Sequence, residues 1–184
     1  GWTQVVTGTG STFSVSERQY IRTGGASSSA LLYLQLFGYS ATDWSKMDWG
    51  KKLDITFEYQ RAGSDATAKG RVQFKPVSTL GDLAAAGIGL YVDNLALYGE
   101  SYGAGGRATV NLSTTLTVSA RVRIRIVLYP SVPKIEWYVD DVLKGTQSTA
   151  GNIPTGDVGD IYIVHSLDNG VGGVDTYSIF APPP

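Results

Sequence analysis

The sequence predicts an all-β domain in which two antiparallel sheets pack face to face as a sandwich. Apolar and polar residues alternate with a period of two along many segments, which is typical of strands with one buried face. About a dozen such segments follow at short intervals, with turn residues between them and at most one short helix. The 23 glycines, among many serines and threonines, fit a chain rich in tight turns and strands.

The clearest strands are four segments with nearly unbroken alternation: 53–60, 71–75, 121–126 and 134–139. In 53–60 every odd position is apolar and every even position is polar. Because side chains alternate across a strand, the apolar positions define one inward face. The predicted core is Ile55, Phe57, Tyr59, Val72, Phe74, Val122, Ile124, Ile126, Leu128, Ile135, Trp137 and Val139.

Other segments are apolar on both faces and are predicted to be more central strands: 30–37, 87–92 and 160–165. Weaker candidates are 2–6, 19–22, 107–112 and 174–180. Hairpins are expected at 91–96 and 138–143, where acidic or amide residues that tolerate positive φ stand between apolar flanks. Only 78–86 is predicted to be helical, for one or two turns capped by Ser78 or Thr79.

Composition favours one soluble domain over 1–180, followed by a proline-rich tail or the start of a linker at 181–184. No segment approaches the roughly 20 apolar residues needed to cross a bilayer, so membrane insertion is not expected. The net charge of −1 gives no attraction for nucleic acid. With no cysteine, disulfides and thiolate metal sites are excluded. A start at Gly1 without Met suggests that a leader, tag or preceding domain was removed.

The second half of the chain carries a family resemblance. After the alternating strand 123–128, the segment 135–143 reads Ile-Glu-Trp-Tyr-Val-Asp-Asp-Val-Leu, followed by Ile153-Pro154 and a strand at 161–163. This order resembles concanavalin A-like lectin/glucanase domains, although Asp141 stands where they usually have Gly. The closing segment 174–180 resembles their last strand. The resemblance implies a jelly-roll sandwich, a fold shared by lectins, glycosidases, adhesion modules and viral surface proteins.

Catalysis is not predicted. Glucanases of that superfamily use a Glu-x-Asp-x-Glu strand, and a retaining mechanism needs two carboxyl groups roughly 5 Å apart. The nearest analogue, Asp54-x-Thr56-x-Glu58, lacks the middle acid, so Glu58 is expected to pair with an arginine across the sheet. His165 is the only histidine and is expected to be a packed strand residue, since Ser166 points to the opposite face.

No cofactor is predicted, and calcium is the one metal that the residue types would suit. Its oxygen ligands could come from acidic and amide residues in turns, although none has EF-hand spacing. Asp and Asn are also the residues that turns require for their backbone conformation. The candidates are Asp157 and Asp160, Asp168 and Asn169, and the turn Asp140-Asp141.

Aromatic residues in polar or glycine-rich surroundings are the better indication of a binding site. Trp44 and Trp49 lie in the polar segment 43–50, and Tyr98 and Tyr102 lie in 98–106, a segment expected to be a flexible loop. Sugar rings stack on such side chains, while neighbouring polar groups bind the hydroxyls. The alternative is that a tryptophan near a strand start packs over the end of the sandwich. The row Arg121, Arg123, Arg125 could bind an anionic glycan, or pair with Asp54, Glu58 and Glu136. 

Three functions remain open on this basis. The first is a non-catalytic, lectin-like module that binds a carbohydrate at an extracellular, virion or cell surface. The second is a structural surface protein, such as a virion coat, decoration or spike domain, whose partners are neighbouring subunits. The third is a glycoside hydrolase or polysaccharide lyase with an unrecognised catalytic pair. The missing acid pair argues against the third, and the first two share the same core pattern.

Overall fold

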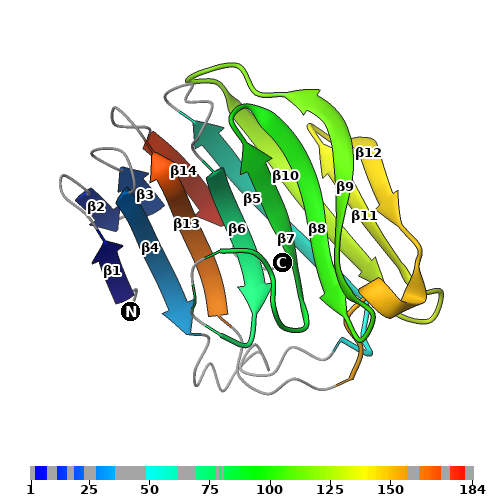
Figure 1. The fold of residues 1–184 in the computed structure, drawn as a ribbon. Helices are drawn as coiled ribbons and strands as arrows, with labels where there is room; N and C mark the ends of the chain where they lie inside the picture. Colours follow the sequence, from blue (N-terminus) through cyan, green and yellow to red (C-terminus); the bar gives the residue numbers. More distant parts are fainter. Residues whose placement is uncertain are drawn as a thin grey trace.

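The computed structural model describes the backbone at 3–7, 12–15, 19–22, 28–35, 49–61, 69–77, 79, 81–156, 162–170 and 175–180, and side chains in the part of this between 49 and 167. Two sheets pack face to face, with all described strand pairs antiparallel (Figure 1). The predicted all-β sandwich is confirmed. In the described residues the single helical element is the 3₁₀ turn η1 (Ala150–Asn152). No helix there is long and apolar enough to span a membrane.

The first sheet contains, in spatial order, β1 (Thr3–Thr7), β4 (Ser28–Gln35), β13 (Tyr162–Gly170), β6 (Lys69–Lys75), β7 (Gly87–Asp93), β8 (Ala96–Gly103) and β9 (Gly106–Thr115). The second contains β12 (Val142–Gln147), β11 (Lys134–Val139), β10 (Arg121–Tyr129), β5 (Leu53–Arg61), β14 (Asp175–Phe180), β3 (Gln19–Arg22) and β2 (Thr12–Val15). Strands β6 to β9 form a meander, the chain crosses to the second sheet for β10 to β12, and it returns through η1 to β13.

Two tight hairpins follow the predicted turn chemistry. Asp140 and Asp141 join β11 to β12 with φ values of 49° and 63°, which is a turn with both central residues in the left-handed region. Between β7 and β8 the register pairs Asp93 with Ala96, so the turn residues are Asn94 and Leu95. Asn94 takes the positive φ of 53° that its short polar side chain tolerates.

The core lies between the sheets and matches the predicted inward face. Eleven of the twelve predicted residues are buried, and the twelfth, Val122, is partly buried and packs against them. The first sheet contributes a second set of buried side chains: Ile88, Leu90, Val92, Leu97 and Leu112. Because side chains point alternately to the two faces of a strand, regular strands are sufficient to direct the core residues of both sheets inward.

Trp137 is the central contact between the sheets. Its ring is fully buried, and its Nε1–H donates to the carbonyl of Gly89 at 3.0 Å. It lies directly against β8, because a Cβ atom at Gly99 would be 2.4 Å from two of its ring carbons. Only glycine at position 99 allows this close approach of ring to backbone.

The predicted helix at 78–86 is absent from the described residues of that segment. Gly81 has φ of +92°, which breaks a right-handed helix. Neighbouring carbonyls accept hydrogen bonds from the sheet instead: Thr79 O from Lys75 Nζ at 2.7 Å, and Gly81 O from Gln73 Nε2 at 3.1 Å. The segment is therefore a connection laid across the outer face of the first sheet, and tertiary hydrogen bonds override its local helix propensity.

His165 lies in the core, as expected for a packed strand residue. It is fully buried, and its ring meets that of Tyr59 edge-on with centroids 6.3 Å apart. Burial disfavours the charged imidazolium and lowers the pKa of His165 to about 3. The imidazole is therefore neutral in the folded protein at any pH above that value.

Replacing Trp137 with Ala is expected to lower the free energy of unfolding by about 3–5 kcal/mol, because the cavity opens between both sheets. Urea denaturation followed by circular dichroism measures the loss. Val142→Ala is the control: its side chain is 55% exposed, and a change within about 0.5 kcal/mol is expected. Equal effects of the two substitutions would contradict the central position of the ring.

The protein should become less stable as the pH is lowered, because His165 is protonated more readily in the unfolded chain than in the folded protein. The unfolded chain takes up a proton near pH 6.5, whereas the folded protein does so only near its lowered pKa of about 3. Between these values the unfolded state binds more protons, so unfolding becomes easier by up to about 1.4 kcal/mol per pH unit.

The measurement is urea denaturation at pH 7.0, 6.0 and 5.0 for wild type and His165→Leu. The variant should have a flatter slope, whatever its absolute stability. Ile163→Val, a core substitution that retains the histidine, should keep the wild-type slope. Parallel pH profiles for wild type and His165→Leu would show that His165 is not the titrating group.

Candidate functional site

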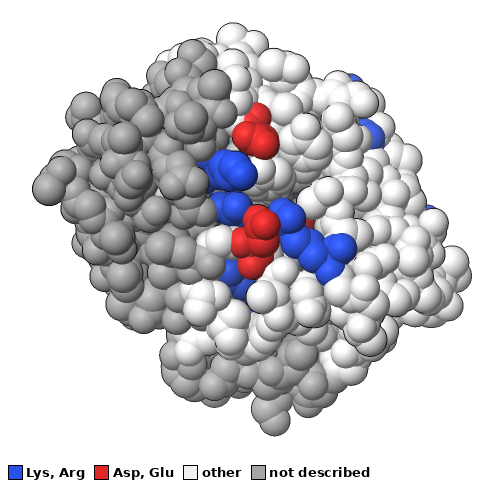
Figure 2. Space-filling model, in the orientation of Figure 1, with Lys and Arg blue, Asp and Glu red and all other residues white. Residues whose placement is uncertain are grey.

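The outer face of β6 to β9 carries an unusual concentration of charged and aromatic side chains. Since Val72 and Phe74 face the core, Arg71, Gln73 and Lys75 of β6 point outward. All three are nevertheless buried, because the connection between β6 and β7 covers them. Acidic and basic residues gather over this part of the sheet (Figure 2).

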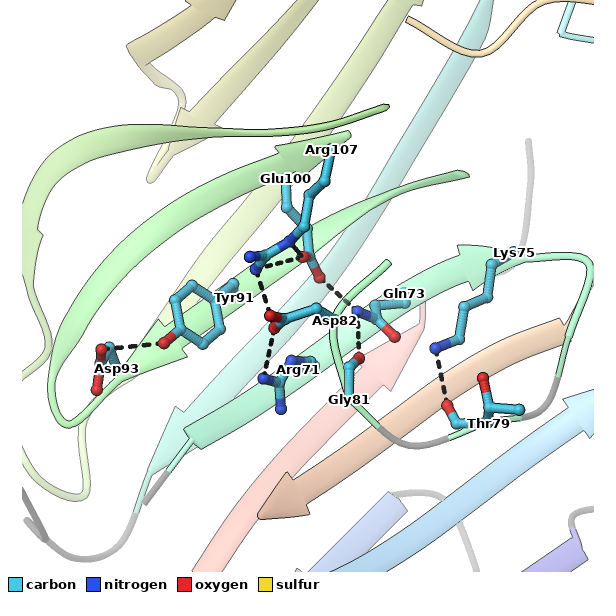
Figure 3. Close-up of polar contacts among 10 residues, drawn as sticks. All are labelled: Arg71, Gln73, Lys75, Thr79, Gly81, Asp82, Tyr91, Asp93, Glu100 and Arg107. Atoms are coloured by element: carbon cyan, nitrogen blue, oxygen red, sulfur yellow. Dashed lines mark hydrogen bonds and ion pairs between the residues drawn. The ribbon is translucent and has the colours of Figure 1, made fainter. Parts of the chain in front are cut away.

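A buried carboxylate, that of Glu100 on β8, is the centre of the cluster (Figure 3). In the register of the sheet, Gln73, Gly89 and Glu100 are successive neighbours on β6, β7 and β8. Because the middle residue has no side chain, Gln73 reaches over β7 and donates from Nε2 to Glu100 Oε1 at 2.5 Å. The glycine at position 89 thus creates a polar contact between two strands that are not adjacent.

Arg107 on β9 binds Glu100 from the other side. Its Nε and Nη2 both donate to Glu100 Oε2, at 3.1 and 3.0 Å. A buried carboxylate is costly unless its charge is compensated and its oxygens accept hydrogen bonds, and here both oxygens of Glu100 do so. Arg107 itself is only partly buried, with 27% of its side chain exposed.

A second carboxylate, that of Asp82, joins two arginines (Figure 3). Its Oδ1 accepts from Arg71 Nη2 at 2.8 Å and lies 3.1 Å from Arg107 Nη2. Partial burial opposes ionisation of Asp82. The hydrogen bond from Arg71 and the charges of Arg71, Arg107 and Lys69 outweigh it and hold the pKa of that carboxyl below its usual value. Asp82, whose side chain is 54% exposed, is therefore ionised at neutral pH.

Tyrosines complete this face. Tyr91 on β7 and Tyr98 on β8 are direct neighbours with ring centroids 5.5 Å apart. The guanidinium groups of Arg71 and Arg107 lie 5.1 and 5.5 Å from the centre of the Tyr91 ring. Tyr98, Glu100 and Tyr102 alternate onto the same side of β8, and Tyr102 pairs directly with Arg107. The partly exposed Tyr98, Arg107 and Tyr102 therefore form a row along the sheet, which we call the tyrosine–arginine row.

The four aromatic residues predicted to bind a ligand have different positions in the structure. Trp44 lies outside the described residues. Trp49 is fully buried and belongs to the core, so its proposed surface role is wrong and the packing alternative holds. Tyr98 and Tyr102 belong to β8 and not to a flexible loop, because the segment pairs with both β7 and β9. They are nevertheless on one accessible face, and their part in ligand binding stays a prediction.

Sequence reasoning missed the charged members of the cluster, Arg71, Asp82, Glu100 and Arg107. Part of the signal was available, since Arg71, Gln73 and Lys75 alternate with apolar residues on β6, and Gly87 and Gly89 alternate on β7. Successive glycines on one face indicate that neighbouring side chains cross over that strand. The order of the strands in the sheet, however, decides which side chains meet.

The arginine row on the second sheet forms ion pairs, as one of the two sequence interpretations expected. Arg125 makes a two-pronged contact with Asp54, at 2.8 and 2.5 Å, and Arg121 lies 3.6 Å from Glu58. Arg123 instead pairs with Asp141 at 3.2 Å. Glu136, the third expected partner, accepts from Lys134 and from the Tyr138 hydroxyl. The first cause of the low pKa of Asp54 is its hydrogen bond from Arg125.

In the part of the chain that the structure describes, no group of three or more His, Cys, Asp or Glu side chains could hold a metal ion. The Asp140 carboxylate accepts from the backbone N–H of Arg123, and that of Asp141 from its guanidinium. Asp157 and Asp160 lie outside the described residues, as do the side chains of Asp168 and Asn169. Calcium binding at these positions stays a prediction.

Comparison with known proteins identifies the fold. No family model and no curated protein matches the chain. Among solved structures, a sialidase has a TM-score of 0.62 at 13% identity over 97% of this chain, which spans 16% of that protein. A Bacillus licheniformis β-glucanase has a TM-score of 0.59 at 16% identity, covering 99% of this chain and 92% of its own. The binding domain of botulinum neurotoxin DC in complex with SialylT has a TM-score of 0.56 at 8% identity, covering 97% and 42%.

These likenesses confirm the concanavalin A-like jelly roll at the level of the fold. At such identities they do not transfer an activity, because one sandwich fold carries many unrelated sites. The named neighbours include both an enzyme, the β-glucanase, and a binding domain. The function of this chain has to be argued from its own side chains.

The ion pairs around Glu100 should dominate the stability of this face. Arg107→Gln leaves the buried Glu100 carboxylate without its charge partner and is expected to cost about 3–5 kcal/mol. Adding Glu100→Gln to that variant should restore part of the loss, because no buried charge remains. Urea denaturation of the two single variants and the double variant measures the coupling.

Arg123→Gln is the matched control for this cycle. It removes an arginine whose partner Asp141 is 64% exposed, and a loss below about 1 kcal/mol is expected. Strictly additive effects of the Arg107 and Glu100 substitutions would mean that the pair contributes nothing specific.

Proposed function

We propose that this chain is a non-catalytic module that binds a glycan on the outer face of β6 to β9. The observation that carries this proposal is the tyrosine–arginine row, in which two partly exposed aromatic rings flank a guanidinium group. Tyrosine rings stack on the apolar faces of sugars, and the guanidinium and neighbouring carboxylate supply directed hydrogen bonds.

Rigidity supports a binding role for this row. Tyr98, Glu100 and Tyr102 are on a central stretch of β8 that pairs on both sides, so their spacing is set by the sheet. The buried contacts of Glu100 with Gln73 and Arg107 fix the guanidinium in place. Side chains held in this way lose little entropy when a ligand binds. Neighbours of the same fold named as a sialidase, a glucanase and a toxin binding domain are consistent with a carbohydrate ligand.

The carboxylates of the site argue against a hydrolase. Asp82 Oδ1 and Glu100 Oε2 both lie close to Arg107 Nη2, at 3.1 and 3.0 Å, so the two acids are near one another. Two close carboxyl groups are not sufficient for a glycosidase, which also needs one acid that is protonated and able to touch the substrate. Glu100 is fully buried, and the pKa of Asp82 is lowered, so neither meets that requirement. A binding module of this kind would act at a cell or virion surface, or outside the cell.

Replacing Tyr98 or Tyr102 with Ala should weaken glycan binding about five- to thirtyfold, corresponding to about 1–2 kcal/mol for a lost stacking contact. A glycan array run with the wild type identifies ligands, and isothermal titration calorimetry with the best of them measures each variant. Tyr138→Ala, on the outer face of the second sheet, should bind like the wild type.

Chain length of the bound glycan, followed by mass spectrometry over hours, tests the non-catalytic part. Glycan shortened by the wild type but not by Asp82→Asn would make the protein an enzyme. Retention of full affinity by both tyrosine variants would place the binding site elsewhere.

A further inference from the structure

The two arginines that meet at Asp82 are arranged as a receptor for a carboxylate. Arg71 Nη2 and Arg107 Nη2 both point at one oxygen atom, Asp82 Oδ1, from 2.8 and 3.1 Å (Figure 3). Guanidinium groups bind carboxylates through short, charge-assisted hydrogen bonds, so two of them that converge on one point favour an anion there. Their stacking against the Tyr91 ring fixes their orientation from below.

The carboxylate now at that point belongs to a connection and not to the sheet. Asp82 lies between β6 and β7, and its side chain is 54% exposed, compared with 4% for Arg71 and 27% for Arg107, so solvent reaches the cluster from the side of Asp82 and Arg107. The backbone beside it is anchored independently, by the bond from Gln73 to Gly81 O and by the buried side chain of Leu83. A change of the Asp82 side-chain rotamer would therefore vacate the position while the connection stays in place.

The converging donors give the chemistry of the replacement. Arg107 stays on Glu100 through Nε and Nη2, while Nη2 of Arg71 and Nη2 of Arg107 both face the position of Asp82 Oδ1. When the Asp82 carboxylate turns away, these two nitrogens present donors that suit another carboxylate. The point of convergence adjoins Arg107, which pairs with Tyr102 and belongs to the tyrosine–arginine row. An anion bound there would be attached to whatever ring stacks on the tyrosines.

We infer that the ligand is a sugar that bears a ring carboxylate, a uronate or a sialate, whose carboxylate displaces Asp82 from between Arg71 and Arg107. Asp82 is then an internal competitor that occupies the anion position in the free protein. This inference deepens the proposed glycan-binding function and rests on it.

The test compares three probes of similar length by calorimetry: an oligogalacturonate, a sialylated oligosaccharide and a neutral cello-oligosaccharide. Wild type is expected to bind a carboxylated probe more tightly than the neutral one. Asp82→Ala should strengthen that binding about tenfold, because the competing carboxylate is gone, and leave the neutral probe within about twofold. The carboxylated probe that gains more identifies uronate or sialate as the source of the carboxylate.

Asp54→Ala is the control, since it removes an aspartate that is paired with one arginine on the opposite sheet and should change no affinity. Asp82→Asn removes the charge with little change of shape and serves if Asp82→Ala does not fold. The expected preference of the wild type for a carboxylated probe over the neutral probe is measured without any variant.

Weaker or unchanged binding of both carboxylated probes by the Asp82 variants overturns the inference. If the neutral probe still binds through Tyr98 and Tyr102 in that case, the proposed function stands without it. If no probe binds to any form of the protein, the proposed function fails, and this inference fails with it.

Discussion

A buried negative charge on the outer side of a sheet is the constraint on which the rest of this face depends. Glu100 is covered although its strand position points away from the core. A buried carboxylate is stable only if its charge is paired and its oxygens accept hydrogen bonds. The groups that do this for Glu100 are linked to one another. Gln73 can reach it because Gly89 leaves β7 bare, Arg107 binds it with two nitrogens, and Asp82 then joins Arg107 to Arg71. The connection between β6 and β7 is held over the sheet as a result.

The ion pairs on the two outer faces of the sandwich differ in burial and in the strands that they link. On the second sheet, Arg125 and Asp54 pair side by side between adjacent strands and remain more than a third exposed. Such exposed pairs contribute little to stability. On the first sheet the pairs link β6, β8, β9 and a connection, and one of them is fully buried. The second sheet also carries tyrosines beside charges, with Arg125 5.4 Å from the centre of the Tyr138 ring and Lys134 4.4 Å from that of Tyr129. Among the described residues, the first sheet differs in that its charged cluster includes the fully buried Glu100.

This difference matters because the fold itself is neutral about function. Jelly rolls of similar topology serve as glucanases and as binding domains, so the shared architecture selects no chemistry. What distinguishes a binding face from a catalytic one is whether its carboxylates can be reached and protonated. Here the arginines lower the pKa of Asp82 and Glu100 is fully buried, which suits recognition of a ligand more than proton transfer to it.

The sequence by itself determined most of the strands, their inward faces and the two hairpins, although 98–103, expected to be part of a loop, lies in β8. Period-two alternation is a local property, and the left-handed Asp140 and Asp141 are local turn chemistry. The same local reasoning predicted a helix at 78–86, which the described residues of that segment do not form, and offered a ligand-binding role for Trp49, whose side chain is buried. In each case a distant group decides: Gln73 and Lys75 draw the carbonyls of that segment onto the sheet, and Trp49 is covered by the sandwich.

The candidate site was recognised only in part for the same reason. Tyr98 and Tyr102 could be singled out by their glycine-rich surroundings, but Glu100 and Gln73 are 27 residues apart and meet across a third strand. Their contact requires the order β6, β7, β8, β9 and a register that sets Gly89 between them. Alternation fixes which side of a strand a residue occupies. Only the tertiary structure decides which strands are neighbours, because hydrogen bonds between strands depend on sheet order and not on sequence spacing.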